Sequence, residues 1–283
     1  MRCRKLGWLA ISGVILIPVA LSAAEGRTEI PFRLYRDYVI VFTGSIGPIQ
    51  KLNFILDTGA VPSVIDRRVA NKLRLGGHVE KVLVFGRELR TREVTLPEVR
   101  FGPVKAMSVP VLCQDLSFVE KELGVRVDAM IGFDVLGRHS FGIDYAAQKL
   151  VFGPVESDAH SHPIQSRPGF VYLTIHVQGR PLYLVVDTGA RDLILFSARL
   201  GNRLDGLRTL STKGSSNLAG KMTLKQMRLT EARLGTNDLG TLNAYLLDNP
   251  EPGNLGFDGS LGVRSLGLTR LAFDFERQTI SWR

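Results

Sequence analysis

Two aspartates, each at the end of a short apolar run, are the residues of this chain best suited to chemistry. Residues 54–60 read FILDTGA and residues 184–190 read LVVDTGA, so Asp57 and Asp187 stand in the same local pattern. An apolar run that breaks at Asp-Thr-Gly predicts a buried strand that ends in a tight turn. A carboxylate buried at such a point is costly unless it has a partner or a task. The pattern therefore marks both aspartates as candidate functional residues.

A pair of aspartates can carry out chemistry that a single one performs poorly. Two carboxyls within hydrogen-bond distance cannot both ionise cheaply, so they share one proton and titrate at different pH values. The ionised member can take a proton from a bound water while the protonated member donates to the carbonyl oxygen under attack. Such chemistry requires neither a metal ion nor an organic cofactor, and the sequence predicts none.

The spacing of the two motifs indicates an internal duplication. Asp-Thr-Gly is an ordinary turn tripeptide, so one copy in a chain of 283 residues would carry little information. Asp187, however, lies 130 residues after Asp57, and other segments keep that offset without a gap. These pairs are 128–132 with 258–262, 136–137 with 266–267, 143–145 with 273–275, and 148–152 with 278–282. A repeat of this period is the size of a small domain, so the sequence predicts two similar halves.

Both halves have the alternating apolar pattern and the frequent glycines that predict short strands and hairpins. In the first half we expect strands over 38–42 and up to Asp57, helices over 63–75 and 116–123, and hairpins over 81–112 that turn at Gly86 and at Gly102-Pro103. In the second half we expect strands over 171–177 and 182–186, a helix over 197–204, hairpins over 210–232 that turn at Gly214 and Gly220, and a loop over 249–253. The polar, proline-containing stretch 155–169 predicts a linker.

The N-terminus has the features of a secretory signal peptide. Arg2, Arg4 and Lys5 precede an apolar run over 6–21, and small residues follow up to Ala24. This order predicts export to the periplasm or the medium, with cleavage after Ala24 and no stable membrane insertion afterwards. An uncleaved anchor is the alternative, although the apolar run is short for a membrane span.

Composition excludes several classes of protein. Cys113 is the one cysteine outside the predicted signal peptide, so the exported chain cannot form an intramolecular disulfide. The formal net charge is +9, but the basic residues are dispersed and form no stripe interleaved with aromatics. The sequence therefore predicts no binding to nucleic acid. His160 and His162 have the spacing of two metal ligands but lack a third, so no metal site is expected.

The duplicated Asp-Thr-Gly-Ala motifs, each followed by an element that ends in glycine (Met130-Ile131-Gly132 and Ser260-Leu261-Gly262), resemble the aspartic peptidase clan. Each half resembles more closely a bacterial retropepsin-like aspartyl protease, with two such halves in tandem as in pepsins. The resemblance covers about residues 30–283. It implies a mainly β, bilobal acid-protease fold, made of two duplicated β-rich lobes with short helices and an active site between them.

This resemblance implies an aspartic endopeptidase that acts on a peptide or protein substrate, with Asp57 and Asp187 as the catalytic pair. The lobes would be 28–154 and 170–283, joined by the linker 155–169. Supporting roles in the catalytic loops fall to Thr58, Gly59, Ala60, Thr188, Gly189, Ala190, Gly132 and Gly262. The threonines would hydrogen-bond across the lobe junction, Gly59 and Gly189 would allow the turns, and Gly132 and Gly262 would pack beside them. Since both aspartates lie on one chain, we expect a monomer with internal pseudo-twofold symmetry.

Three departures from the family pattern concern specificity and pH optimum more than the fold. Ser260 stands where the first half has the apolar Met130, and Arg191 stands where the first half has Val61. The expected flap over 85–96 contains no tyrosine. A peptide-binding protein that kept this fold and lost turnover is the alternative class. An aspartyl-phosphate enzyme fits less well, because it would need one such aspartate and a magnesium site.

Overall fold

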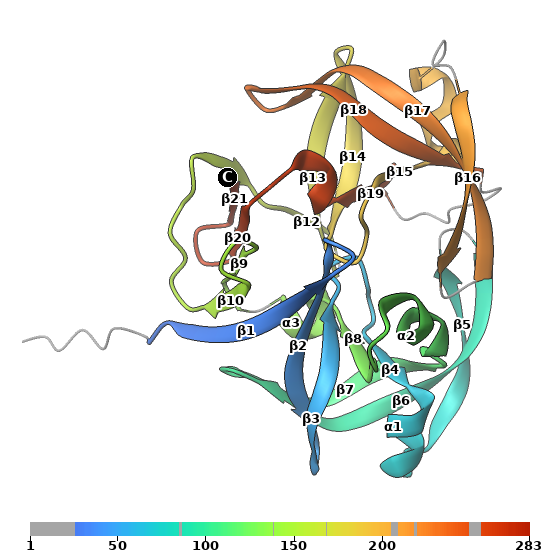
Figure 1. Cartoon of the computed structure of the whole chain (residues 1–283), viewed down its shortest axis with the longest axis vertical. Coiled ribbons are helices and arrows are strands. Elements are labelled where there is room, and N and C mark those ends of the chain that lie inside the picture. The colour runs from blue at the N-terminus through green and yellow to red at the C-terminus, as the bar shows by residue number, and fades with distance from the viewer. Residues whose placement is uncertain are drawn as a thin grey trace, which may run out of the picture.

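The chain is mainly β, as the sequence predicts. The computed structural model describes residues 26–84, 87–137, 139–167, 169–204, 209–217, 220–248 and 256–283. Within these ranges the strands form one sheet of 13 strands and one of 8, with only short helices (Figure 1). None of the helices in this part of the chain has the length and apolar content that a membrane crossing requires. The predicted signal peptide over 1–24, the turn at Gly86 and the loop over 249–253 lie outside the described residues.

The first half of the chain forms most of the larger sheet. Its strands are β1 (Thr28–Tyr35), β2 (Val39–Ile46), β3 (Ile49–Leu56), β4 (Val64–Asp66), β5 (Gly77–Val84), β6 (Arg87–Phe101), β7 (Val104–Gln114), β8 (Ala129–Ile131), β9 (Phe141–Asp144) and β10 (Lys149–Phe152). Eight of them lie side by side in the order β1-β2-β3-β8-β4-β7-β6-β5. The helices between them are α1 (Arg67–Lys72), α2 (Ser117–Leu123) and α3 (Phe133–Leu136).

The second half repeats this arrangement strand for strand. Its strands are β12 (Gln165–Arg167), β13 (Phe170–Val177), β14 (Arg180–Asp187), β15 (Leu193–Phe196), β16 (Thr209–Asn217), β17 (Gly220–Leu234), β18 (Asn237–Leu247) and β19 (Gly259–Gly262). They lie in the order β12-β13-β14-β19-β15-β18-β17-β16, which matches the order of the first half. The helices here are α4 (Ser197–Leu200) and the 3₁₀ turns η1 (Gly201–Leu204) and η2 (Val263–Leu266). The 130-residue repeat is thus a repeat of topology.

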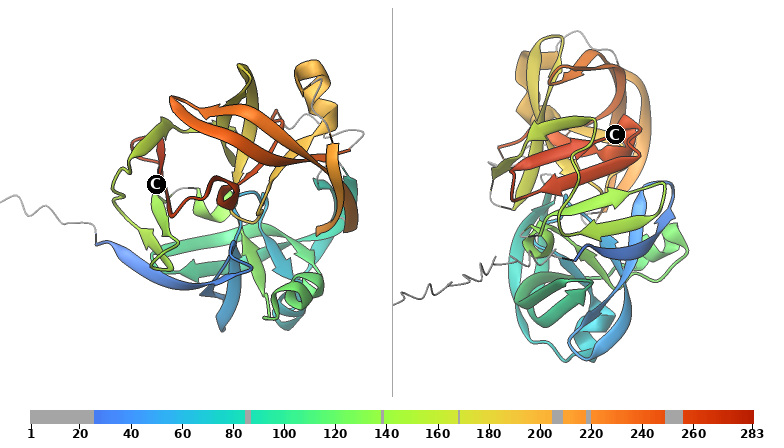
Figure 2. Two further views of the ribbon diagram at one scale, coloured as in Figure 1. Left: turned by 45° about the horizontal axis from the view of Figure 1, so that its top comes forward. Right: turned by 90° about the vertical axis from the view of Figure 1, so that its left-hand side faces the viewer.

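A sheet shared by the two halves joins them. Strands β11 (His160–Pro163), β20 (Arg270–Asp274) and β21 (Thr279–Trp282) extend the larger sheet in the order β11-β21-β20-β9-β10-β1. Figure 2, right, shows these strands between the two halves. Antiparallel β9 and β20 pair with Ile143 opposite Leu271 and Phe141 opposite Phe273. Residues 141 and 143 correspond to 271 and 273 in the repeat, so this register is the one that a two-fold rotation between the halves produces.

An aromatic cluster connects the motif of the first half to the shared sheet. Phe54, three residues before Asp57, packs edge-on against Phe42 with ring centroids 5.8 Å apart. The contacts continue across the core through Phe101, Phe152, Phe141 and Phe273. All of these rings are almost fully buried. Aromatic pairs of this geometry stabilise beyond the area that they bury. The packing therefore ties the strand that ends at Asp57 to the other half of the chain.

The predicted helix over 63–75 is shorter than expected. Residues 64–66 form strand β4, in which Val64 lies between Leu112 of β7 and Met130 of β8. The β-branched pair Val64-Ile65 suits this buried strand better than a helix. The helix α1 begins only after Asp66, whose carboxylate accepts a hydrogen bond from the Arg68 amide at 2.8 Å and so caps it.

Two other details differ from the sequence prediction. The segment predicted as a linker contains β11 and β12, which are short, polar edge strands without the apolar alternation that marks a strand in a sequence. Gly214 lies inside β16, opposite Thr223, and does not form a turn. By contrast, α2 and the turn at Gly102-Pro103 lie where the sequence predicts them.

Candidate active site

The two aspartates lie at equivalent strand ends in the two halves. Asp57 directly follows β3, which pairs in parallel with β8, and Asp187 ends β14, which pairs in parallel with β19. Both carboxyl groups are largely buried, with 8% and 7% of each residue exposed. The strand pairing thus brings each motif beside the glycine-ending element of its own half.

Thr58 and Thr188 join the two motifs by four buried hydrogen bonds. The Thr58 amide donates to Thr188 Oγ1 at 3.0 Å, and the Thr188 amide donates to Thr58 Oγ1 at 3.0 Å. Each hydroxyl in turn donates to a carbonyl of the opposite strand, Thr58 to Val186 at 2.7 Å and Thr188 to Leu56 at 2.9 Å. Both threonines are fully buried. This exchange holds the two turns in register, as the resemblance implies.

Gly59 and Gly189 are needed for close approach rather than for an unusual backbone angle. Neither has a positive φ, so the expectation that they free the turn conformation is corrected. A Cβ on Gly59 would lie 2.5 Å from Cγ of Asp187, and one on Gly189 would lie 2.5 Å from Cγ of Asp57. Each aspartate therefore packs against the glycine of the other motif, a contact that any side chain there would prevent.

Gly132 and Gly262 lie against the same two turns. A Cβ on Gly132 would lie 1.7 Å from the Ala60 carbonyl oxygen, and one on Gly262 would lie 2.4 Å from the Arg191 carbonyl carbon. These are contacts with backbone, which cannot move aside as a flexible side chain could. All ten residues that the sequence singled out thus lie together at the junction of the halves.

The hydrogen bonds to the two carboxyls are unequal. Asp187 Oδ1 accepts from the amides of Gly189 at 2.9 Å and Ala190 at 3.0 Å, and its Oδ2 accepts from the Ser260 hydroxyl at 2.5 Å. Asp57 Oδ1 accepts from the amide of Gly59 at 3.1 Å. The Ser260 contact was not predicted, although the sequence shows Ser260 as a departure from the apolar pattern.

Burial and mutual repulsion disturb the titration of both groups. Burial raises the pKa of Asp57 well above its ordinary value, and the neighbouring Asp187 carboxyl raises it further. Burial also raises the pKa of Asp187, while the Ser260 hydroxyl and the amides of Gly189 and Ala190 oppose that rise. The titration of each carboxyl therefore depends on the other. This is the behaviour of a pair that shares one proton.

A second polar network supports the turn of the first half alone. Ser63 Oγ donates to Asp134 Oδ1 at 2.6 Å and accepts from the Gly132 amide at 2.9 Å. The Ser63 amide also donates to Asp134 Oδ2 at 2.8 Å. The repeat places Leu193 and Arg264 at the positions of Ser63 and Asp134, so the second half has no such network. Spacing alone could not identify it, since it is not duplicated.

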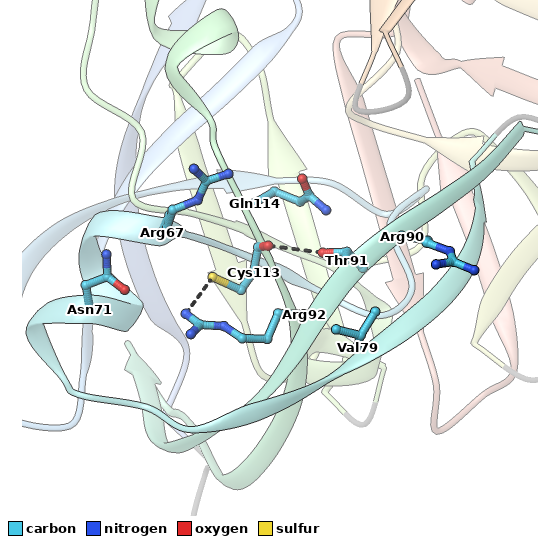
Figure 3. A pocket seen from close by; sticks show the side chains of 8 residues that line it. All are labelled: Arg67, Asn71, Val79, Arg90, Thr91, Arg92, Cys113 and Gln114. Atoms are coloured by element: carbon cyan, nitrogen blue, oxygen red, sulfur yellow. Dashed lines mark hydrogen bonds between the residues drawn. The ribbon is translucent and has the colours of Figure 1, made fainter.

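A hollow on the first half lies apart from the aspartates. It is lined by residues of α1, β5, β6 and β7, among them Arg67, Val79 and Arg92 (Figure 3). Arg92 Nη2 lies 3.4 Å from Sγ of the buried Cys113, and the Thr91 hydroxyl donates to the Cys113 carbonyl at 3.0 Å. Cys113 thus makes structural contacts within the first half. Within the described ranges no three His, Cys, Asp or Glu side chains cluster in a way that could hold a metal ion.

The comparison with protein families agrees with this geometry. Residues 42–135 match the aspartyl protease family. The matched segment includes the first motif, Asp57 to Ala60, and the glycine Gly132 that packs on it. No curated protein matches the chain. The family match thus supports a protease function for this chain, on the half that carries Asp57.

Proposed function

We propose that the chain is an aspartic endopeptidase that hydrolyses peptide bonds with the Asp57/Asp187 pair. The observation that carries this proposal is the pair of buried, interacting carboxyls on two turns that Thr58 and Thr188 hold together. A pair held in this way keeps one proton and one negative charge between two oxygens, as acid–base hydrolysis requires. The aspartyl protease match over 42–135 supports the same activity.

The proposed reaction uses a water molecule between the two carboxyls. The ionised carboxylate removes a proton from the water, whose oxygen attacks the carbonyl carbon, while the protonated carboxyl gives its proton to the carbonyl oxygen. In the tetrahedral intermediate, the carboxyl that took the proton from water then gives it to the leaving nitrogen. The carboxyl that had donated its proton takes one back from a hydroxyl. The C–N bond breaks, the carbonyl re-forms, and both carboxyls return to their starting states.

The substrate would lie between the aspartates and two hairpins. Strand pairs β5–β6 and β16–β17 occupy equivalent places in the two halves and lie on the same side of the molecule (Figure 1; Figure 2, left). Val79 on β5 and Leu210 on β16 expose apolar side chains, 72% and 52% respectively. An extended peptide with apolar residues suits such a surface. The first of these hairpins includes part of the flap expected over 85–96.

Peptide cleavage tests the proposal directly. The chain without residues 1–24 is incubated with a diverse peptide library between pH 3 and pH 8. Cleavage at internal bonds is expected, and it should disappear in the Asp57→Asn variant. Peptides that are captured by the protein but recovered intact would contradict the proposal and support the alternative, a peptide-binding protein on the same fold.

We expect the active unit to be a single chain. Both aspartates and both threonines of the junction already lie on one polypeptide, and the pairing of β9 with β20 holds the two halves together. Specific activity should therefore stay constant over a hundredfold dilution, with sedimentation showing a monomer throughout. Activity that falls steeply as a dimer dissociates would contradict this expectation.

We also propose that the chain is exported. The basic start, the apolar run and the small residues before Ala24 support this. Expression in a bacterial host should yield a processed protein outside the cytoplasm whose first residue is Glu25. A full-length chain retained in the membrane fraction would instead indicate an uncleaved anchor.

A further inference from the structure

The two aspartates have a symmetric frame but an asymmetric set of hydrogen-bond donors. The two amide-to-hydroxyl bonds between the threonines are equal in length at 3.0 Å, and each glycine would place a Cβ 2.5 Å from the opposite carboxyl carbon. Within the described residues, however, a side chain donates to Asp187, the Ser260 hydroxyl at 2.5 Å, whereas the protein donors to Asp57 are backbone amides. The difference therefore lies in that side-chain donor, since the frame and its amides are shared.

Ser260 is the side chain that breaks the symmetry. It lies opposite Val185 on β14 and opposite Ile194 on β15. Met130 lies opposite Ile55 on β3 and opposite Val64 on β4, so it occupies the same position in the first half. Ser260 is buried, with 4% of the residue exposed, and its hydroxyl is 2.5 Å from Asp187 Oδ2. A methionine thioether has no hydrogen to donate, so Met130 cannot make the equivalent bond to Asp57.

A donated hydrogen bond favours the charged form of the carboxyl that accepts it. In a buried pair that shares one proton, the negative charge settles on the member with more donors, and the proton on the other. We propose that Ser260 is a positioning residue that holds Asp187 as the ionised member of the pair and leaves the shared proton on Asp57. This inference rests on the proposed function for its consequence in catalysis.

The assignment gives each carboxyl a role in the free enzyme. Asp187 is the base that takes the proton from water, and Asp57 is the acid that donates to the carbonyl oxygen. The directions of the two titrations agree with this: burial raises the pKa of both carboxyls, the Asp187 carboxyl raises the pKa of Asp57 further, and the Ser260 hydroxyl opposes the rise in the pKa of Asp187. The Ser260 bond also orients the Asp187 carboxylate.

The pH profile of peptide cleavage tests the role of Ser260. The acid limb of kcat/KM reports protonation of the base, so losing the Ser260 donor should raise the pKa of that limb. In Ser260→Ala we expect the limb to move up by about one pH unit, with a larger change in kcat than in KM. Ser260→Thr, which keeps the hydroxyl, should restore the wild-type limb. Met130→Ala, the matched truncation in the other half, should leave it in place.

Two results of that experiment would overturn the inference. An acid limb that stays in place in Ser260→Ala would show that the hydroxyl does not bias the pair. A limb that moves as far in Ser260→Thr as in Ser260→Ala would show that packing at this position matters and the hydrogen bond does not.

A second measurement does not depend on activity. In the Asp57→Asn background Asp187 titrates without a charged neighbour, and carbon-13 NMR of its carboxyl follows that titration. In the double variant, which carries both Asp57→Asn and Ser260→Ala, Asp187 should titrate about one pH unit higher than in Asp57→Asn alone. Equal values would overturn the inference. If the wild type cleaves no peptide yet the titration shifts, then the proposed protease function fails while the bias that Ser260 imposes on Asp187 stands.

Discussion

Asparagine at position 57 or at position 187 should lower the rate of peptide hydrolysis at least ~1,000-fold, and asparagine at both positions should lower it no further. In each step one carboxyl takes a proton while its partner gives one, so neither carboxyl can act alone. Asparagine has nearly the shape of aspartate, so the threonine bonds across the junction remain possible. Rates at the optimal pH for the three variants provide the measurement.

An exposed carboxylate supplies the control for this experiment. Asp115 lies at the start of α2, where its side chain accepts a hydrogen bond from the Ser117 amide at 2.9 Å. Asp115→Asn keeps an acceptor there and should retain wild-type activity. Substantial hydrolysis in either single variant of the pair, or a double variant much slower than both, would mean that the two aspartates do not act as one unit.

The duplication of the fold could be predicted because the same local sequence patterns recur in both halves. Apolar runs, Asp-Thr-Gly turns and glycine spacing recur at a fixed offset, and the same local pattern produced the same strand order in both halves. The short edge strands β11 and β12 could not be predicted, because polar residues such as His160 pair there without an apolar face. Pairing of β9 with β20 also depends on docking of the halves, which no local pattern describes.

The candidate site, too, could be predicted only in part from the sequence. The threonines and the motif glycines could be assigned from the resemblance, since their role follows from the backbone of the motif itself. The reason for Gly59 could not, because its close neighbour is Asp187, 128 residues away in the chain. Arg191 is visible in the sequence as a departure, but its partner is Asp37 at 3.6 Å, and both side chains are more than half exposed. The effect of Ser260 likewise depends on the register of β19 against β14.

The electrostatic strain between the aspartates should be visible in the stability of an inactive variant. Burial and the Asp187 charge raise the pKa of Asp57 in the folded protein well above its ordinary value, near 3.9 in an unfolded chain. Between those two pH values the native state binds more protons than the unfolded state, so the stability of the wild type falls as the pH rises through this interval. Each pH unit of elevation corresponds to about 1.4 kcal/mol. Asp57→Asn removes this dependence.

We therefore expect Asp57→Asn to melt several degrees higher than the wild type at pH 7 to 8, with the advantage shrinking towards pH 4. Asp258→Asn is the matched control, because Asp258 is also buried but accepts hydrogen bonds from Arg203 at 2.5 Å and 2.8 Å. Neutralising that carboxylate leaves the guanidinium without its anionic partner and should lower the melting temperature at pH 8. Thermal unfolding of the three proteins between pH 4 and pH 8 measures both effects. If Asp57→Asn were no more stable than the wild type at pH 8, the two carboxylates would not repel one another in the folded protein. The two aspartates would then have no reason to share a proton.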